Sequence, residues 1–141
     1  MGSTFVITTI THNRALHFSN SSLAEIAVNE INHCASDGFL ENHAWVVMPD
    51  HIHWLLTLRK GNLGNCLQTF KSRSARAINM LSGTCGPVWQ SGFYDHCLRD
   101  DEDLLKQARY LALNPVRRGL VSRIEDYPFW WCRWIQNSAD L

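Results

Sequence analysis

Several features that mark secreted, disulfide-stapled or membrane proteins are missing from this 141-residue chain. The cysteines number five, an odd count, and no two of them are spaced as C-x-x-C. This argues against a disulfide framework and a cysteine zinc site, and it favours reduced thiols in the cytoplasm. No apolar run approaches the roughly 20 residues of a membrane helix, and the first residues lack the regions of a signal peptide. We therefore expect one cytoplasmic domain over residues 1–141, with no membrane partner.

Acidic residues are absent from two long stretches, 51–94 and 104–124, although the formal net charge of the chain is zero. The basic residues in these stretches are Arg59, Lys60, Lys71, Arg73, Arg76, Lys106, Arg109, Arg117, Arg118 and Arg123. A neutral protein with one basic face fits this distribution, and such a face would suit a nucleic-acid partner. Charge runs are also common on faces that only contact water, so charge alone leaves both interpretations open.

The apolar periodicity predicts the order strand, helix, strand, strand, helix, strand, helix. We expect strands at 5–11, 43–48, 51–58 and 88–98, the last bent at Gly92, and helices at 21–38, 62–81 and about 100–114. Pro49 and Asp50 form the short connection of a hairpin. Ser22 and Glu25 match a capping box, and the acidic run 100–103 suits a helix start. This order indicates an α+β, ferredoxin-like βαββαβ antiparallel sheet with helices on one face, followed by an additional C-terminal helix.

Two histidines, His51 and His53, interrupt a strand that is otherwise apolar. Because side chains alternate along a strand, the two imidazoles share one face. We expect Ile52, Trp54 and Leu56 to face the helices, and the imidazoles to look out from the opposite face. Two neutral imidazoles at this spacing can bind one divalent metal ion. Such pairs also occur as packing or solvent-facing residues, so the spacing alone is weak evidence.

The last predicted helix has an apolar stripe and a polar face. At 3.6 residues per turn, Tyr110 lies off the stripe beside Lys106, Gln107 and Asn114. Tyr110 and Asn114 are neighbours on the helix surface, where they offer a phenol hydroxyl and an amide oxygen together. From spacing alone, the simpler explanation is a surface tyrosine, with Asn114 ending the helix before Pro115.

Five segments occur in the order VVMPDHIHWLL, FKSRSARAIN, WQSGFYDHCLRDDEDL, YLALNPVRRGLV and DYP. Together they closely resemble the REP-associated tyrosine transposases, single-tyrosine members of the HUH nuclease superfamily, and the resemblance covers nearly the whole chain. By this resemblance His51 and His53 match the HUH pair, Tyr110 the nucleophile, and Asn114 a third metal ligand. It implies a bacterial enzyme with Mg²⁺ or Mn²⁺ as cofactor that cuts single-stranded DNA near palindromic hairpins through a 5′-phosphotyrosine. Such an enzyme would be cytoplasmic, associated with the nucleoid when bound to DNA, and a monomer or homodimer.

Other side chains are expected to meet DNA or to assist the chemistry. The expected DNA-binding residues are Arg14, Lys71, Arg73, Arg76, Arg117 and Arg118. Lys106 and Gln107, one turn before Tyr110, could assist its deprotonation. His96 could be a metal ligand or a DNA contact, or simply pack on its strand. The aromatic segment of about 125–141 is expected to pack on the domain as a hydrophobic lid.

Three classes of function are open at this point. The first is a metal-dependent single-stranded DNA endonuclease and strand transferase. The second is a non-catalytic relative that keeps the fold and binds single-stranded or hairpin nucleic acid, and the third is a metal-dependent hydrolase of small phosphates. The presence of every proposed catalytic residue type favours the enzyme over the binder. The enzyme interpretation requires that His51, His53, Asn114 and the Tyr110 hydroxyl converge on one pocket.

Overall fold

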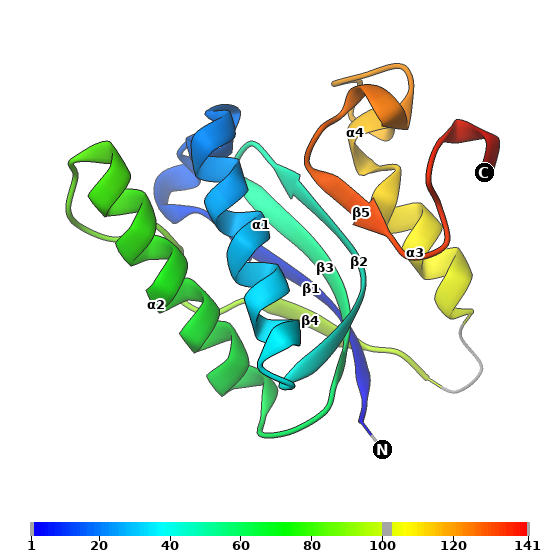
Figure 1. Ribbon diagram of the computed structural model, residues 1–141, viewed down its shortest axis with the longest axis horizontal. Helices are drawn as coiled ribbons and strands as arrows, with labels where there is room; N and C mark the ends of the chain where they lie inside the picture. Colours follow the sequence, from blue (N-terminus) through cyan, green and yellow to red (C-terminus); the bar gives the residue numbers. More distant parts are fainter. Residues whose placement is uncertain (1, 100–102, 141) are drawn as a thin grey trace.

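The computed structural model describes residues 2–99 and 103–140, and its centre is one antiparallel sheet. Five strands follow the order β4-β1-β3-β2-β5 (Figure 1). Their bounds are Thr4–Ile10 for β1, Leu40–Met48 for β2, His51–Leu58 for β3, Tyr94–Cys97 for β4 and Trp130–Cys132 for β5. The first four strands and the two helices between them have the ferredoxin-like βαββαβ order, which confirms the predicted fold class.

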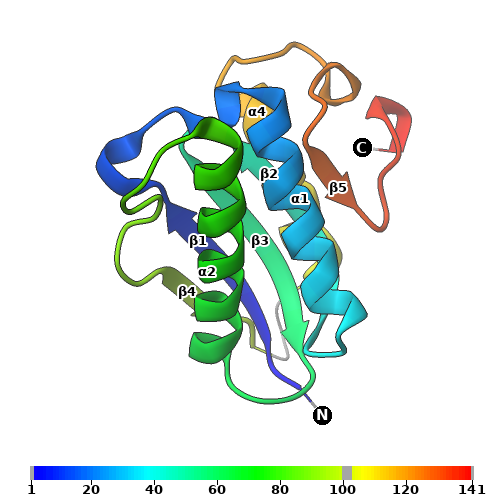
Figure 2. The ribbon, with the colours of Figure 1, turned by 60° about the vertical axis from the view of Figure 1, so that its left-hand side comes forward.

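Two long helices, α1 (Ser21–Ser36) and α2 (Leu63–Ser82), cover one face of the sheet (Figure 2). Ile52, Trp54 and Leu56 belong to this layer, as alternation along β3 predicts. The fully buried Trp54 packs edge-on against Phe70 of α2, with ring centroids 5.2 Å apart, and its Nε1 donates to Asn42 Oδ1 at 2.7 Å. Buried aromatic packing of this kind fixes the strand, and thereby the direction of the residues on its other face.

The opposite face is not open, contrary to the expectation that the imidazoles look out from it. Helix α3 (Leu104–Ala112) has the predicted apolar stripe, and its Leu111 and Ala112 form a second core with Leu55 of β3. Burying that stripe requires a partner surface, and the second face of the sheet provides it. His51 is only 5% exposed and His53 is half-buried on this covered face.

The start of α1 differs from the predicted capping box. The N-cap is Asn20, whose Oδ1 accepts from the backbone N–H groups of Ser22 (2.9 Å) and Leu23 (3.4 Å). Asparagine is among the best N-cap residues, so it caps the helix before Ser22 can pair with Glu25. At the other end Gly38, with φ 79°, ends the helix as predicted.

The C-terminal helix is shorter than expected and is followed by a second one. Helix α3 ends at Ala112, Leu113 leaves helical geometry with ψ 4°, and α4 (Asn114–Arg117) begins anew. Pro115 cannot donate to the carbonyl of Leu111, which explains the break. At the start of α3, Asp103 Oδ1 accepts from two backbone N–H groups. Residues 100–102 of the predicted acidic cap lie outside the described residues.

The buried face of α2 and the final strand of the ferredoxin-like unit also differ in detail. Helical periodicity predicts that Leu81 shares the apolar stripe of α2 with Leu67 and Phe70, but it is 60% exposed, whereas Ser74 and Ile78 are buried. The predicted strand 88–98 is reduced to β4 and an isolated bridge at Trp89, because Gly92 adopts φ 74° between them.

The C-terminal segment adds β5 to the sheet edge, which the sequence did not predict. The deeply buried residues of this segment are Cys132 and Ile135, whereas Trp131 and Trp134 are exposed and only Trp130 is half-buried. In place of the expected hydrophobic lid, the segment forms a short strand with one buried side, and two of its three tryptophans are exposed. None of the helices in the described ranges combines the length and apolar character that crossing a bilayer requires.

Candidate functional site

The histidine pair lies where β3 leaves the β2–β3 hairpin, and His51 is its buried member. His51 Nδ1 donates to Asp50 Oδ1 at 2.6 Å. A carboxylate only accepts hydrogen bonds, so a neutral ring in this contact carries its proton on Nδ1 and keeps Nε2 as an acceptor. Nε2 is buried and has no hydrogen-bond partner among the described residues. Buried polar atoms are rarely left in that state, which indicates a partner beyond the described residues.

His53 shares this face, and its ring centroid lies 4.8 Å from that of His51, with the planes at 81°. Its Nδ1 is 3.0 Å from the hydroxyl of Thr8, its cross-strand neighbour on β1. Burial, followed by the nearby His51, Arg118 and Arg117, lowers the pKa of His53 to about 4. Burial also lowers the pKa of His51. Both rings are therefore neutral at pH 7, the form in which imidazole binds a metal ion.

Any metal site built on this pair needs a ligand of another type. Within residues 2–99 and 103–140, no group of three or more histidine, cysteine, aspartate or glutamate side chains is placed to hold a metal ion. The expected third ligand, Asn114, is only 8% exposed at the start of α4. Two neutral imidazoles with an amide oxygen form a donor set that fits Mn²⁺ or Mg²⁺.

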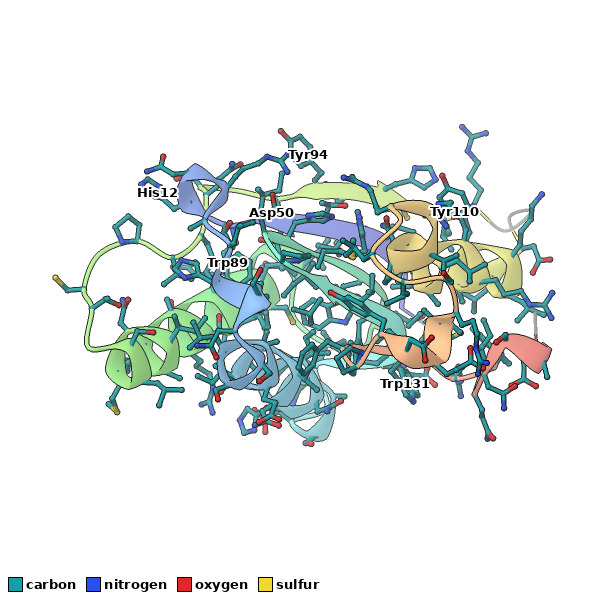
Figure 3. The ribbon with its side chains drawn as sticks, turned by 90° about the horizontal axis from the view of Figure 1, so that it is seen from above. His12, Asp50, Trp89, Tyr94, Tyr110 and Trp131 are labelled. Atoms are coloured by element: carbon teal, nitrogen blue, oxygen red, sulfur yellow. The ribbon has the colours of Figure 1, made fainter. Side chains whose placement is uncertain are left out.

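Tyr110 lies on the outer side of α3 and is 63% exposed (Figure 3). Arg117 of α4 covers its ring, with Cζ 3.6 Å from the ring centroid, and Arg117 Nη1 donates to the Tyr110 carbonyl. Tyr110 is exposed whereas Asn114 is buried, and the helix breaks at Leu113 between them. The convergence of the hydroxyl with the histidine pair and Asn114 stays a prediction.

Two of the three cations considered next, all expected to contact DNA, have a carboxylate partner within the fold. Arg14 Nη1 lies 3.3 Å from Asp50 Oδ2, and Arg73 Nε lies 2.7 Å from Glu30 Oε1 of α1. These two guanidinium groups are partly neutralised, which lowers their availability to phosphates. Arg76 is exposed on α2. A DNA role for each of the three stays a prediction.

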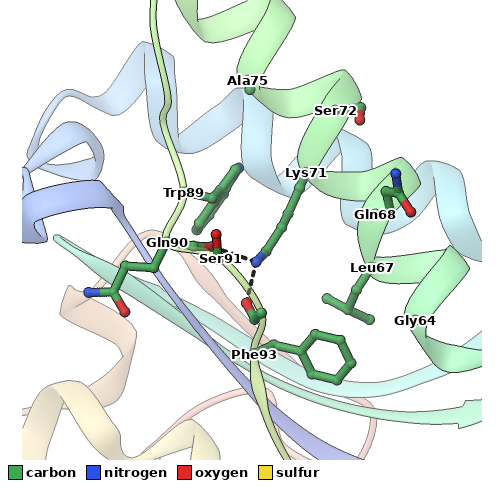
Figure 4. A pocket seen from close by; sticks show the side chains of 11 residues that line it. Gly64, Leu67, Gln68, Lys71, Ser72, Ala75, Trp89, Gln90, Ser91 and Phe93 are labelled. Atoms are coloured by element: carbon green, nitrogen blue, oxygen red, sulfur yellow. Dashed lines mark hydrogen bonds between the residues drawn. The ribbon is translucent and has the colours of Figure 1, made fainter.

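Lys71 has a structural role on the same helix. Its Nζ donates to the backbone carbonyls of Gln90, at 2.8 Å, and Gly92, so it ties α2 to the segment before β4 (Figure 4). The contact lies in the wall of a hollow of about 460 Å³ between α2 and residues 89–93. Burial lowers the pKa of Lys71. Phosphate contact by this ammonium would require it to leave these carbonyls.

The residues predicted to assist Tyr110 occupy different surroundings. Lys106 is exposed and Gln107 half-buried on α3, and His96 is exposed on β4. Assistance to Tyr110 by Lys106 and Gln107 stays a prediction, and so does a role of His96 as a metal ligand or DNA contact.

Two contacts to the imidazoles were missed from the sequence. Asp50 gave a signal, because a carboxylate directly before His51 in a two-residue turn lies within reach of its ring. Thr8 gave none, because it reaches His53 only through the pairing of β1 with β3. Both are side chains that orient a ring by occupying Nδ1.

The chain belongs to the IS200-like transposase family, whose model matches residues 3–110. Within that family it is similar to the REP-associated tyrosine transposase of Escherichia coli (strain K12). The two are 34% identical over 91 residues, which is 63% of this chain and 52% of that protein. A relative from Haemophilus influenzae is 30% identical over 100 residues, covering 63% of this chain and 57% of its own. The chain thus spans about half the length of the curated relatives it matches.

Comparison with solved structures agrees with the sequence relationship. A REP-associated tyrosine transposase bound to a REP hairpin matches with a TM-score of 0.75 and 27% identity, over 92% of this chain and 76% of that one. A protein of Deinococcus radiodurans matches with a TM-score of 0.56 and 18% identity, over 78% and 86% of the two chains, and this likeness shows the fold alone. The resemblance predicted from the five segments is confirmed.

Proposed function

We propose that this chain is a metal-dependent single-stranded DNA endonuclease and strand transferase of the bacterial cytoplasm, acting near palindromic hairpins through a 5′-phosphotyrosine. The observation that supports it most directly is the buried, unpartnered Nε2 of His51 beside a second neutral imidazole. Such a pair is poorly explained as packing, because an apolar residue would fill the same space without an unsatisfied atom. In a chain of the IS200-like transposase family, a metal ion is the partner that fits it.

His51, His53 and Asn114 would hold Mg²⁺ or Mn²⁺. When bound, the ion would polarise a non-bridging phosphate oxygen and offset its charge. Arg118, whose charge lowers the pKa of both histidines, would add a second positive group for the phosphate.

The covalent step exchanges one phosphoester for another. The Tyr110 hydroxyl loses its proton, and its oxygen forms a bond to phosphorus. The bond from phosphorus to the 3′-oxygen breaks, and that oxygen takes up a proton and leaves as a 3′-hydroxyl. The DNA is then joined to Tyr110 through its 5′-phosphate. Attack by a free 3′-hydroxyl on this linkage is the reverse exchange, which supplies strand transfer as well as cleavage.

The test is formation of a covalent protein–DNA adduct. The protein is incubated with single-stranded hairpin oligonucleotides, taken from palindromes of its own genome, with Mn²⁺ or Mg²⁺. A denaturing gel then resolves the adduct. We expect an adduct with wild type, and none with Tyr110→Phe or with a chelator. Tyr94→Phe is the matched control, because Tyr94 is an exposed tyrosine on β4 and should leave the adduct intact.

Two other outcomes would replace the proposal. Hairpin binding without any adduct would support the non-catalytic relative. An adduct that survives His51→Ala at full yield would show that the imidazole pair does not hold the required ion.

A further inference from the structure

Asp50 lies between a guanidinium group and an imidazole. Its Oδ1 accepts from His51 Nδ1 at 2.6 Å, and its Oδ2 accepts from Arg14 Nη1 at 3.3 Å. The Asp50 side chain is 21% exposed, compared with 6% for His51 and 58% for Arg14, so the chain of contacts runs from the surface inward. Arg14, which was expected to contact DNA, thus has a partner in the fold that leads to His51.

The backbone around Arg14 is built to reach Asp50. Asn13 and Arg14 adopt φ of 56° and 52°, a left-handed conformation that non-glycine residues seldom adopt. Two successive residues in this region are retained only where surrounding contacts hold them. The fully buried Thr11 supplies such contacts, because its N–H donates to the Asp50 carbonyl at 3.0 Å and its hydroxyl lies 2.8 Å from the Ala15 carbonyl.

A further hydrogen bond ties the same two segments together. The N–H of Phe18 donates to the carbonyl of Pro49 at 3.0 Å. Both residues of the hairpin turn are therefore fixed to the segment after β1, and Asp50 is held in place by its backbone as well as by its side chain. A two-residue hairpin turn can form without hydrogen bonds to another segment, so these bonds are not needed for the turn itself.

We propose that Asp50, held by Arg14, is the positioning residue for His51: it fixes the Nδ1–H tautomer and thereby presents Nε2 to a divalent metal ion. This inference rests on the proposed metal site. It assigns Arg14 to the support of that site rather than to direct DNA contact, and it accounts for the buried Nε2 that has no partner among the described residues. Carboxylates that orient metal-binding histidines commonly act in this way.

Two measurements on the metal-free and Mn²⁺-loaded full chain test the inference. The first is the ¹⁵N spectrum of the histidine rings without metal, in which His51→Ala assigns the His51 signals. The second is Mn²⁺ affinity by electron paramagnetic resonance. The Asp50→Asn variant keeps the size of the side chain in the turn, and Asp50→Ala removes the contact. Arg59→Ala is the matched control, because it breaks an arginine–carboxylate pair at the end of β3 opposite to His51.

We expect wild-type His51 to be protonated on Nδ1, and both Asp50 variants to lose that preference and to bind Mn²⁺ about 10- to 100-fold more weakly. Arg14→Ala should weaken Mn²⁺ binding less, and Arg59→Ala should leave it unchanged. Wild-type tautomer and affinity in both Asp50 variants, with binding lost in His51→Ala, would overturn the inference and leave the proposed function intact. Mn²⁺ binding that survives His51→Ala would instead overturn the metal site and the inference together. Arg14→Ala that weakens only hairpin binding would overturn the role given to Arg14.

Discussion

Acidification should destabilise the metal-free protein, chiefly through its buried histidines. Burial is the main cause that lowers the pKa values of His43, His51 and His53 in the folded state. In the unfolded chain each imidazole returns to its ordinary pKa and takes up a proton more readily. As the pH falls below about 6.5, protons therefore stabilise the unfolded state, and the free energy of unfolding decreases.

His53 supplies the magnitude. Its pKa falls from 6.5 to about 4 on folding. At about pH 5 the unfolded ring is almost fully protonated while the folded ring is largely neutral, which corresponds to about 2 kcal/mol. His53 is only half-buried, so solvent screening reduces its share to roughly 1–2 kcal/mol. The loss is absent above pH 7, grows as the pH falls, and levels off only below the folded pKa of about 4.

Urea unfolding in the presence of a chelator, followed by tryptophan fluorescence between pH 7.5 and 4.5, measures this loss. His53→Gln should remove roughly 1–2 kcal/mol of the difference in unfolding free energy between pH 7.5 and 5. An unfolding free energy that is flat across this range, or a His53→Gln variant as acid-sensitive as wild type, would refute the reasoning.

Three further predictions concern residues around the site. Arg117→Ala removes a cation stacked on the Tyr110 ring, an interaction worth about 0.5–2 kcal/mol. Adduct formation should therefore slow about 2- to 30-fold, with Arg123→Ala as the control. Unchanged kinetics in Arg117→Ala would exclude a positioning role for Arg117. Tyr127→Phe removes a 2.6 Å hydrogen bond to the Val47 carbonyl and should lower the free energy of unfolding by about 1 kcal/mol; equal urea midpoints would contradict this. Arg76→Ala should weaken hairpin binding and reduce its salt slope by about 1, more than Arg73→Ala, whose guanidinium is paired with Glu30. The reverse ranking in a salt titration would count against the basic face of α2.

Local patterns predicted the parts of the fold that local physics decides. Alternation placed Ile52 and Trp54 in the helix-covered core, and Gly38 was predicted to end α1 because the left-handed conformation there suits glycine. The cover over the histidine face could not be predicted in the same way. The stripe of α3 indicated that the helix is buried, but the surface it meets depends on contacts between segments far apart in the sequence.

For the candidate site as well, features that are local in the sequence could be predicted and the others could not. The His51–His53 spacing and the adjacency of Asp50 are local features, and the resemblance gave Tyr110 and Asn114 their proposed roles. We expected one regular helix through Leu113, although Pro115 prevents its continuation. For this reason the exposure of Tyr110 and the burial of Asn114 were not predicted.

The zero net charge of the chain is a poor guide to the field at the histidine face. Glu41 pairs with Arg59 and Arg133 near the start of β2, at the far end of the strand from Met48, which pairs with His51. The acid-free stretch 104–124 forms α3 and α4, and α3 packs over the histidine face. Glu41 is thus offset by its own arginine partners, and the field that meets an incoming phosphodiester depends on the local arrangement of charges rather than on their sum. A neutral chain can therefore attract DNA at one face, and the attraction should weaken as salt screens it.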